Sequence, residues 1–148
     1  MSAVPALLLP LGSDLYALPL DWAHEVVAAP TVTPLVTGPP VVVGLFNLRG
    51  QIVPLFDTAA LLGVGRTSLA AFAVVVSSPQ GLAGLTTSGL PRRVVLDTPT
   101  GSSELVGTAG LFRVGREVAA LLDPAVLLSP EQVRGRGPVL EPTMTRDR

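Results

Sequence analysis

The segment that decides the fold reads Gly44-Leu45-Phe46-Asn47-Leu48-Arg49-Gly50-Gln51-Ile52-Val53-Pro54-Leu55-Phe56-Asp57. It combines an apolar run, a short turn and a single charge, because Arg49 is the only charged residue between Glu25 and Asp57. An unpaired buried charge is too costly to keep in a protein interior. We therefore expect Arg49 either on an exposed loop or against a specific partner, for which Glu25 is a candidate.

The turn in this segment is signalled by Asn47 and Gly50, which flank Leu48-Arg49. Both residue types tolerate left-handed backbone angles. The pattern predicts a protruding turn that carries Arg49, followed by a strand from Gln51 to Phe56.

Composition favours one all-β domain with frequent turns. The chain has 148 residues, the usual size of a single domain, and 48% of them are hydrophobic. Valine and leucine dominate the apolar set, and the 15 glycines and 15 prolines divide the chain into short elements. A net charge of -1 gives no general attraction to nucleic acid.

Several compartments and chemistries are disfavoured by what the sequence lacks. It contains no cysteine, which excludes disulfides and thiol nucleophiles. No run approaches the roughly 18 to 20 apolar residues that span a bilayer, and the N-terminus has no positively charged region typical of a signal peptide. We expect a cytoplasmic protein with no direct membrane insertion.

Short strands separated by turn residues run through the chain. Strands or extended segments are predicted over residues 6–11, 15–20, 31–37, 41–46, 51–56, 72–76, 82–87, 92–96, 105–112 and 117–122. Residues 21–28 fit either a short helical turn or a strand. Short helices are predicted over 57–62 and 123–128, each headed by an aspartate suited to capping. The order strand, turn, strand, helix occurs twice, which is a weak internal repeat.

Catalytic chemistry has little support in the sequence. There is one histidine and no lysine, so a P-loop is excluded. His24-Glu25 begins like a zinc-protease motif, but position 28 is alanine, so the second histidine is missing. We expect no enzyme activity, no metal site and no cofactor.

The sequence resembles a CheW-like domain, which belongs to the chemotaxis coupling-protein family, in three places. These are the strand Leu15 to Leu20, the triplet Glu25-Val26-Val27 and the segment 44–57. Val74 to Val76, Gly84-Leu85 and the run from Leu121 to Leu128 continue the match, so that the resemblance covers residues 6–130. Its most specific element is the Asn-Leu-Arg-Gly turn followed by an Ile-Val-Pro strand.

The resemblance implies an all-β fold with short helices, made of two linked five-stranded SH3-like β-barrels that share a hydrophobic core. It also implies a non-catalytic adaptor that joins the cytoplasmic tips of methyl-accepting chemoreceptors to the regulatory domain of a CheA-type histidine kinase. Such an adaptor lies in the cytoplasm at membrane-anchored receptor arrays that control flagellar or pilus-based motility. Motif matching assigns partner binding to Ala23, Glu25 and Arg49, and shaping of the arginine loop to Gly44, Asn47 and Gly50.

One segment departs from the family pattern. After Gly84-Leu85 the family usually shows an apolar-Asp pair, whereas this chain has Thr86-Thr87-Ser88-Gly89-Leu90-Pro91. A changed partner surface on the second barrel is one interpretation of this difference. Residues 131–148 are rich in proline, glycine and charge, which predicts a loose tail.

The alternative function is an SH3-like β domain that binds a small ligand or a peptide as a sensor.

Overall fold

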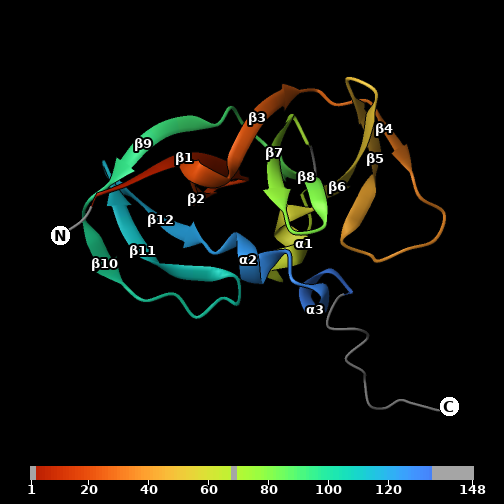
Figure 1. Ribbon diagram of the computed structural model, residues 1–148. Helices are drawn as coiled ribbons and strands as arrows, with labels where there is room; N and C mark the ends of the chain where they lie inside the picture. Colours follow the sequence, from red (N-terminus) through yellow and green to blue (C-terminus); the bar gives the residue numbers. More distant parts are fainter. Residues whose placement is uncertain (1–2, 68–69, 135–148) are drawn as a thin grey trace, which may run out of the picture.

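The computed structural model describes residues 3–67 and 70–134, which form two six-stranded sheets side by side (Figure 1). The first sheet has the strand order β10-β11-β12-β2-β1-β9. Its strands are β1 (Val4–Leu11), β2 (Asp14–Pro19), β9 (Arg92–Leu96), β10 (Pro99–Gly101), β11 (Thr108–Val114) and β12 (Glu117–Leu122). The chain thus contributes both its beginning and its end to this sheet.

The second sheet is built from the middle of the chain, in the order β3-β7-β8-β6-β5-β4. Its strands are β3 (Ala23–Ala28), β4 (Val32–Pro34), β5 (Val42–Leu48), β6 (Gln51–Phe56), β7 (Phe72–Ser78) and β8 (Gly81–Thr87). A short 3-10 turn, η1 (Leu20–Trp22), connects β2 to β3. Residues 21–28, for which the sequence allowed either a helical turn or a strand, therefore contain both, because η1 ends at Trp22 and β3 begins at Ala23.

The two sheets repeat one topology. Each has a central parallel pair, β6 with β8 and β12 with β2, between antiparallel hairpins. A short helix follows the inner strand of one hairpin in each sheet: α1 (Thr58–Leu62) follows β6, and α2 (Pro124–Leu127) follows β12. The N-terminal hairpin β1–β2 occupies the place that β7–β8 holds in the other sheet. The weak sequence repeat is thus confirmed as a structural one, with its second copy circularly permuted.

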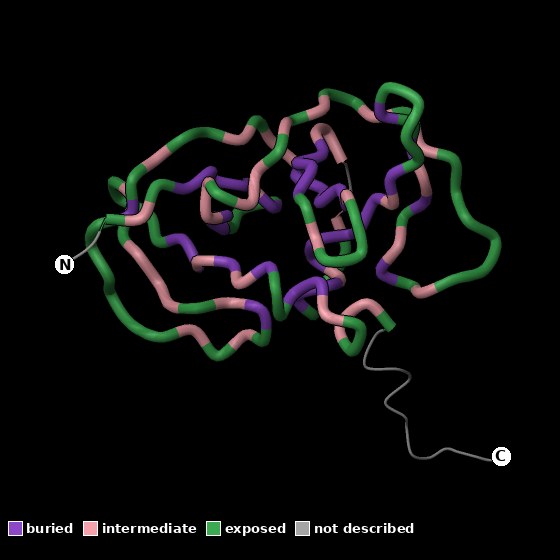
Figure 2. The backbone as a smooth tube through the Cα atoms, in the orientation of Figure 1, coloured by how far each residue is buried: buried purple, intermediate pink, exposed green. Residues whose placement is uncertain are grey.

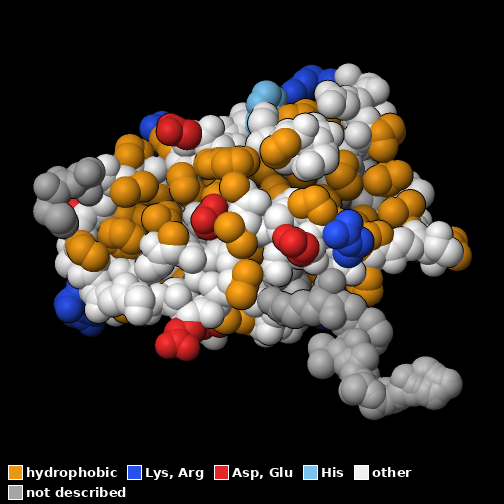
Figure 3. All heavy atoms as spheres, turned by 60° about the horizontal axis from the view of Figure 1, so that its bottom comes forward, with side chains coloured by type: hydrophobic (Ala, Val, Ile, Leu, Met, Phe, Trp, Pro, Cys, Tyr) orange, Lys and Arg blue, Asp and Glu red, His pale blue; other side chains and the backbone are white. Residues whose placement is uncertain are grey.

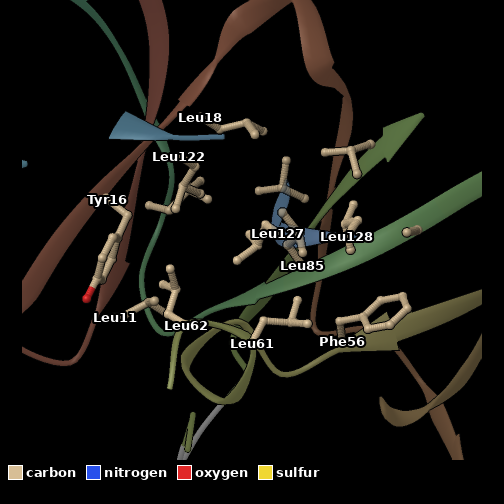
Figure 4. Packing of buried hydrophobic residues seen from close by; sticks show 14 of the residues in the cluster. Leu11, Tyr16, Leu18, Phe56, Leu61, Leu62, Leu85, Leu122, Leu127 and Leu128 are labelled. Atoms are coloured by element: carbon tan, nitrogen blue, oxygen red, sulfur yellow. The ribbon is translucent and has the colours of Figure 1, made fainter. Parts of the chain in front are cut away.

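A hydrophobic core lies between the two sheets and is shared by them. Buried side chains from both meet there with the helices α1 and α2, and they include Leu18, Leu85, Leu122 and Leu127, each no more than 1% exposed (Figure 4). Each sheet also has a smaller cluster of its own, around Val53 and Val75 in one and around Leu8 and Ala17 in the other. Buried residues accordingly lie along the inner strands of both sheets, and exposed residues lie along the outer loops (Figure 2).

The expectation of two small β units with a shared core is confirmed, with six strands in each sheet instead of five. The difference comes from the three-residue strands β4 and β10, which extend each sheet beyond its hairpin. An extended segment was predicted where β4 lies and no strand was predicted where β10 lies, because strands this short carry no readable alternation.

The C-terminal part of the fold extends further than expected. A third helix, α3 (Pro130–Val133), begins with Ser129 as its N-cap and is attached to α1 through Gln132, whose Nε2 donates to the carbonyl oxygen of Leu61 at 3.0 Å. The expected loose tail thus cannot begin at residue 131, and its remainder, 135–148, lies outside the described residues. No helix in the described part of the chain is long and apolar enough to cross a membrane.

Candidate functional site

The turn between β5 and β6 is a two-residue hairpin loop formed by Arg49 and Gly50. Leu48 pairs with Gln51, and the two loop residues have φ of 51° and 89°. Tight hairpins favour positive φ at both loop positions, because that backbone matches the twist of the flanking strands. The turn was predicted one residue too early: Arg49 itself takes the left-handed conformation.

Asn47 stabilises this turn through its side chain. Its Oδ1 accepts a hydrogen bond from the backbone N–H of Gly50 at 2.8 Å. Along β5 the side chains alternate, so that Phe46 and Leu48 are buried while Asn47 is exposed beside the turn. The hairpin therefore holds the guanidinium of Arg49 at the surface of the second sheet.

Arg49 forms a two-pronged ion pair with Glu25. Nη1 of Arg49 donates to Oε2 of Glu25 at 3.0 Å, and Nη2 donates to Oε1 at 2.5 Å. The side chain of Arg49 is 67% exposed and that of Glu25 is 28% exposed. The two planar groups match in this geometry, which is the strongest form of an arginine–carboxylate contact. The hypothesis that Glu25 contacts Arg49 is confirmed.

The ion pair connects parts of the sheet that have no backbone pairing with one another. Glu25 lies on the edge strand β3, opposite Val75 of β7, whereas Arg49 lies in the turn between β5 and β6, which β7 and β8 separate from β3 in the strand order. The sheet curls until its edge strand meets the β5–β6 turn, and the pair bridges the open seam of the barrel. Tertiary folding thus brings together two charges that are 24 residues apart in the sequence.

The pair changes the acidity of both partners. The hydrogen bonds from Arg49 lower the pKa of Glu25 below its usual 4.5, with the positive charges of Arg49 and His24 acting in the same direction and desolvation opposing them. The same hydrogen bonds and charge raise the pKa of Arg49. Both groups are therefore charged across the neutral pH range, and the site presents a fixed dipole.

Ala23 and Gly44 lie apart from this ion pair. Ala23 starts β3, is separated from Glu25 by an irregularity in the strand, and packs against the shared core. Gly44 lies within β5 opposite Pro34, not in the arginine loop. A Cβ at Gly44 would overlap the carbonyl oxygen of Thr33 and lie 2.7 Å from Cγ1 of Val32. Its small size permits β4 to approach, so its role is in strand pairing.

Two residues of the segment that departs from the family pattern lie inside the fold, whereas Leu90 of the same segment is exposed. Thr86 and Thr87 end β8 and are both fully buried. Thr86 Oγ1 accepts from the backbone N–H of Thr58 at 3.0 Å, and Thr58 Oγ1 donates to the carbonyl oxygen of Thr86 at 2.7 Å. Thr86 and Thr58, the first residue of α1, therefore satisfy each other's hydrogen-bonding groups inside the fold.

Ser88 continues this segment and joins the two sheets. Its backbone N–H donates to the carbonyl oxygen of Pro10 at 2.9 Å, and its Oγ accepts from the backbone N–H of Gly12 at 2.8 Å. These bonds attach the end of β8 to the β1–β2 turn. The segment acts as a structural link, which the sequence could not show because its partners are 76 or more residues away.

The described residues offer little for catalysis. Within them, no group of three or more histidine and acidic side chains is placed to hold a metal ion. His24 lies on the surface with Nε2 3.9 Å from Oε1 of Glu25. Asp57 is the N-cap of α1, since its Oδ1 accepts a hydrogen bond from the backbone N–H of Ala60 at 3.1 Å. What the geometry does provide is an exposed, rigidly oriented ion pair on a β hairpin.

Fold and site together define a double β-barrel domain of SH3-like type with a presented arginine turn. Residues 5–132 match the family model described as a CheW-like domain, and the chain belongs to this family. Its fold is similar to that in the crystal structure of the scaffolding protein TtCheW from Thermoanaerobacter tengcongensis. The TM-score is 0.73 at 20% sequence identity, over 86% of this chain and 94% of that chain. No curated protein matches the chain significantly.

Proposed function

We infer that this chain is a non-catalytic adaptor of a chemotaxis-type array, which couples the cytoplasmic tips of chemoreceptors to the regulatory domain of a CheA-type histidine kinase. Membership of the CheW-like family and the likeness to a scaffolding protein support the adaptor role. The observation that carries the site assignment is the exposed, bidentate Arg49–Glu25 pair. In this proposal the chain works in the cytoplasm, at membrane-anchored receptors.

The energetics of the pair fit recognition better than stability. An exposed ion pair contributes little to folding because water screens it and the side chains lose entropy. At a protein interface the same charges would be desolvated, and truncating one of them would leave the other buried and unpaired. The positive φ of Arg49 fits this view, since a non-glycine residue in that conformation carries backbone strain.

The test is binding of the purified chain to a kinase regulatory domain and to a receptor cytoplasmic fragment, for wild type and for Arg49→Ala and Glu25→Ala. We expect affinity for one of the two partners to fall by roughly 30-fold or more. Arg116→Ala is the matched control, because Arg116 is exposed in the equivalent two-residue turn between β11 and β12. Binding by both site variants at wild-type strength would refute the assignment.

A charge-swapped variant separates recognition from structure. Glu25→Arg combined with Arg49→Glu keeps an ion pair across the seam but reverses its direction. If the pair only holds the barrel together, the double variant binds both partners normally. If Arg49 contacts a partner, the double variant keeps the wild-type thermal midpoint and still fails to bind.

The sensor alternative has no comparable observation in its favour. Two grooves on the surface of the described fold are open, and most of their lining is apolar. Ligand pockets usually place several polar groups around one cavity to fix orientation. The adaptor remains the function that the site supports best.

A further inference from the structure

A small pocket of about 120 Å³ lies between the two sheets, beside the β1–β2 turn. The strand β2 supplies Asp14 and Tyr16 from the first sheet, and the segment after α1 supplies Arg66 and Thr67 from the side of the second sheet. Ser88, which follows β8, also lines the pocket. Ligand sites often form where two structural units meet, but this volume is well below the roughly 300 to 1,000 Å³ of pockets that hold drug-sized molecules. A ligand of this pocket therefore has to be small.

Hydrogen bonds inside the fold hold the walls of this pocket in place. Thr67 donates to the buried carboxylate of Asp57 from its backbone N–H at 3.0 Å and from its Oγ1 at 2.8 Å. Ser88 Oγ accepts from the backbone N–H of Gly12 at 2.8 Å and donates to the carbonyl oxygen of Pro10 at 3.1 Å. The walls are thus formed before any ligand arrives, which lowers the entropy cost of binding.

Tyr16 brings a hydrogen-bond donor to the pocket. The residue is only 5% exposed, and its hydroxyl has no hydrogen-bond partner among the described residues. In Figure 4 this hydroxyl points away from the leucines of the shared core. Buried tyrosine hydroxyls usually have a polar partner, because a buried polar group without one costs free energy. Burial, and to a smaller extent the negative charge of Asp14, raises the pKa of Tyr16, so the phenol keeps its proton at neutral pH.

Two charges of opposite sign reach the same pocket. Asp14 and Arg66 line it from different sheets, and both residues are exposed. Neither forms an ion pair with another residue in the described part of the chain. Charged side chains make up 14% of the sequence and are scattered among hydrophobic ones on the face shown in Figure 3. A pocket that joins one charge of each sign is therefore a distinctive feature of this surface.

These charges decide which kind of small ligand fits. A simple anion would be repelled by Asp14, and a simple cation would be repelled by Arg66. A small zwitterion satisfies both groups, because a guanidinium donates paired hydrogen bonds to a carboxylate and an ammonium group donates to a carboxylate of the protein. The small volume excludes a long side chain on such a ligand.

We propose that this pocket binds a free α-amino acid with a small side chain, whose carboxylate contacts Arg66 and the Tyr16 hydroxyl and whose ammonium group contacts Asp14. The bound amino acid connects β2 to the segment after α1 and so bridges the two sheets. The site is independent of the proposed adaptor function, because none of its lining residues belongs to the Arg49–Glu25 ion pair.

The composition of the chain supplies a direct probe of the pocket. Tyr16 is the only tyrosine, so protein labelled with ¹³C at the tyrosine ε positions gives one ring signal, from the pocket itself. We expect added L-alanine to shift this signal along a saturable curve with its midpoint in the millimolar range, which suits a few charge-assisted hydrogen bonds. A signal that does not move, or that moves linearly without saturating, would overturn the proposal.

Two analogues test whether both charges of the ligand are needed. Propionate is alanine without its ammonium group, and ethylamine is alanine without its carboxylate. Each should bind at least about tenfold more weakly than L-alanine, because each leaves one charge of the pocket without a partner. Propionate binding as tightly as L-alanine would show a simple anion site, and ethylamine binding as tightly would show a simple cation site; in either case the proposal would be wrong.

Variants assign the binding to the pocket. Asp14→Asn and Arg66→Gln each remove one charge at an exposed position, so both should keep the thermal midpoint of the wild type and raise the L-alanine midpoint at least about tenfold. Arg116→Gln is the matched control, because Arg116 is exposed on the β11–β12 turn outside the pocket, and it should leave the curve unchanged. Wild-type binding by both pocket variants, or an equal loss in the control, would refute the assignment.

Discussion

Replacing Asp57 with alanine tests how the fold holds α1, the helix that follows the arginine hairpin. The Asp57 carboxylate is 4% exposed and has no ion-pair partner among the described residues. It accepts from the backbone N–H of Ala60 at 3.1 Å, from the backbone N–H of Thr67 at 3.0 Å and from Thr67 Oγ1 at 2.8 Å. Asp57 therefore caps α1 and also fastens the segment that follows the helix.

The expected loss follows from these contacts. Removing a helix N-cap costs about 0.5 to 2 kcal/mol, and leaving a buried donor without an acceptor costs about 1 to 3 kcal/mol. We expect Asp57→Ala to lower the free energy of unfolding by about 2 to 4 kcal/mol. Asp57→Asn retains one acceptor oxygen and should lose about half as much or less.

The assay is equilibrium unfolding in urea, and the internal repeat supplies its control. Asp123 heads α2 at the equivalent place in the other sheet, but its side chain makes no capping hydrogen bond. Asp123→Ala should therefore cost at most about 0.5 kcal/mol. Equal losses in the two variants, or a loss below about 0.5 kcal/mol for Asp57→Ala, would refute the reasoning that buried hydrogen bonds give Asp57 its role.

Three further predictions concern other parts of the molecule. The folded-state pKa of Glu25 is lowered below 4.5, so the stabilising contribution of Glu25 is fully present above pH 4.5 and is lost as pH falls through the folded-state pKa. Wild type and Glu25→Gln should therefore differ in thermal midpoint at pH 7 and converge in strong acid, and a difference that persists in strong acid would contradict this. Gly44→Ala should lower the free energy of unfolding by about 1 to 3 kcal/mol through overpacking against β4, measured by urea denaturation against Gly50→Ala, whose Cβ would meet no atom within 4 Å but whose positive φ would strain the turn. Leu85→Ala, in the core that both sheets share, should cost about 2 to 5 kcal/mol in a single cooperative transition seen by circular dichroism; two separate transitions would show that the sheets unfold independently.

Local patterns were sufficient to predict most of the elements. The strands β6, β9 and β12 have the boundaries predicted from their apolar runs and flanking turns, and α1 begins after the predicted cap Asp57. These features depend on residues a few positions apart, which sequence spacing records directly. The membership of the shared core could not be predicted residue by residue, because its side chains come from distant parts of the chain.

The candidate site illustrates the same limit. The isolation of Arg49 in neutral sequence pointed to an exposed loop or a specific partner, and the structure shows both at once. No local signal could show that Glu25 is this partner, because the contact depends on how far the sheet curls. The role of Gly44 was misplaced for a related reason: its neighbour across the strands, Thr33, is set by a pairing that the sequence does not encode locally.

The sequence by itself determined that this chain forms short strands and turns, that it presents Arg49 on a β hairpin, and that it has neither a cysteine nor a lysine side chain. These properties follow from residue type and from spacing along the chain. Only the tertiary structure decided that Glu25 pairs with Arg49, that Thr86 and Thr87 are internal, and that Arg134 lines an apolar groove. The physical reason is that burial and charge pairing are settled between distant segments, after the sheets have curled and packed on one another.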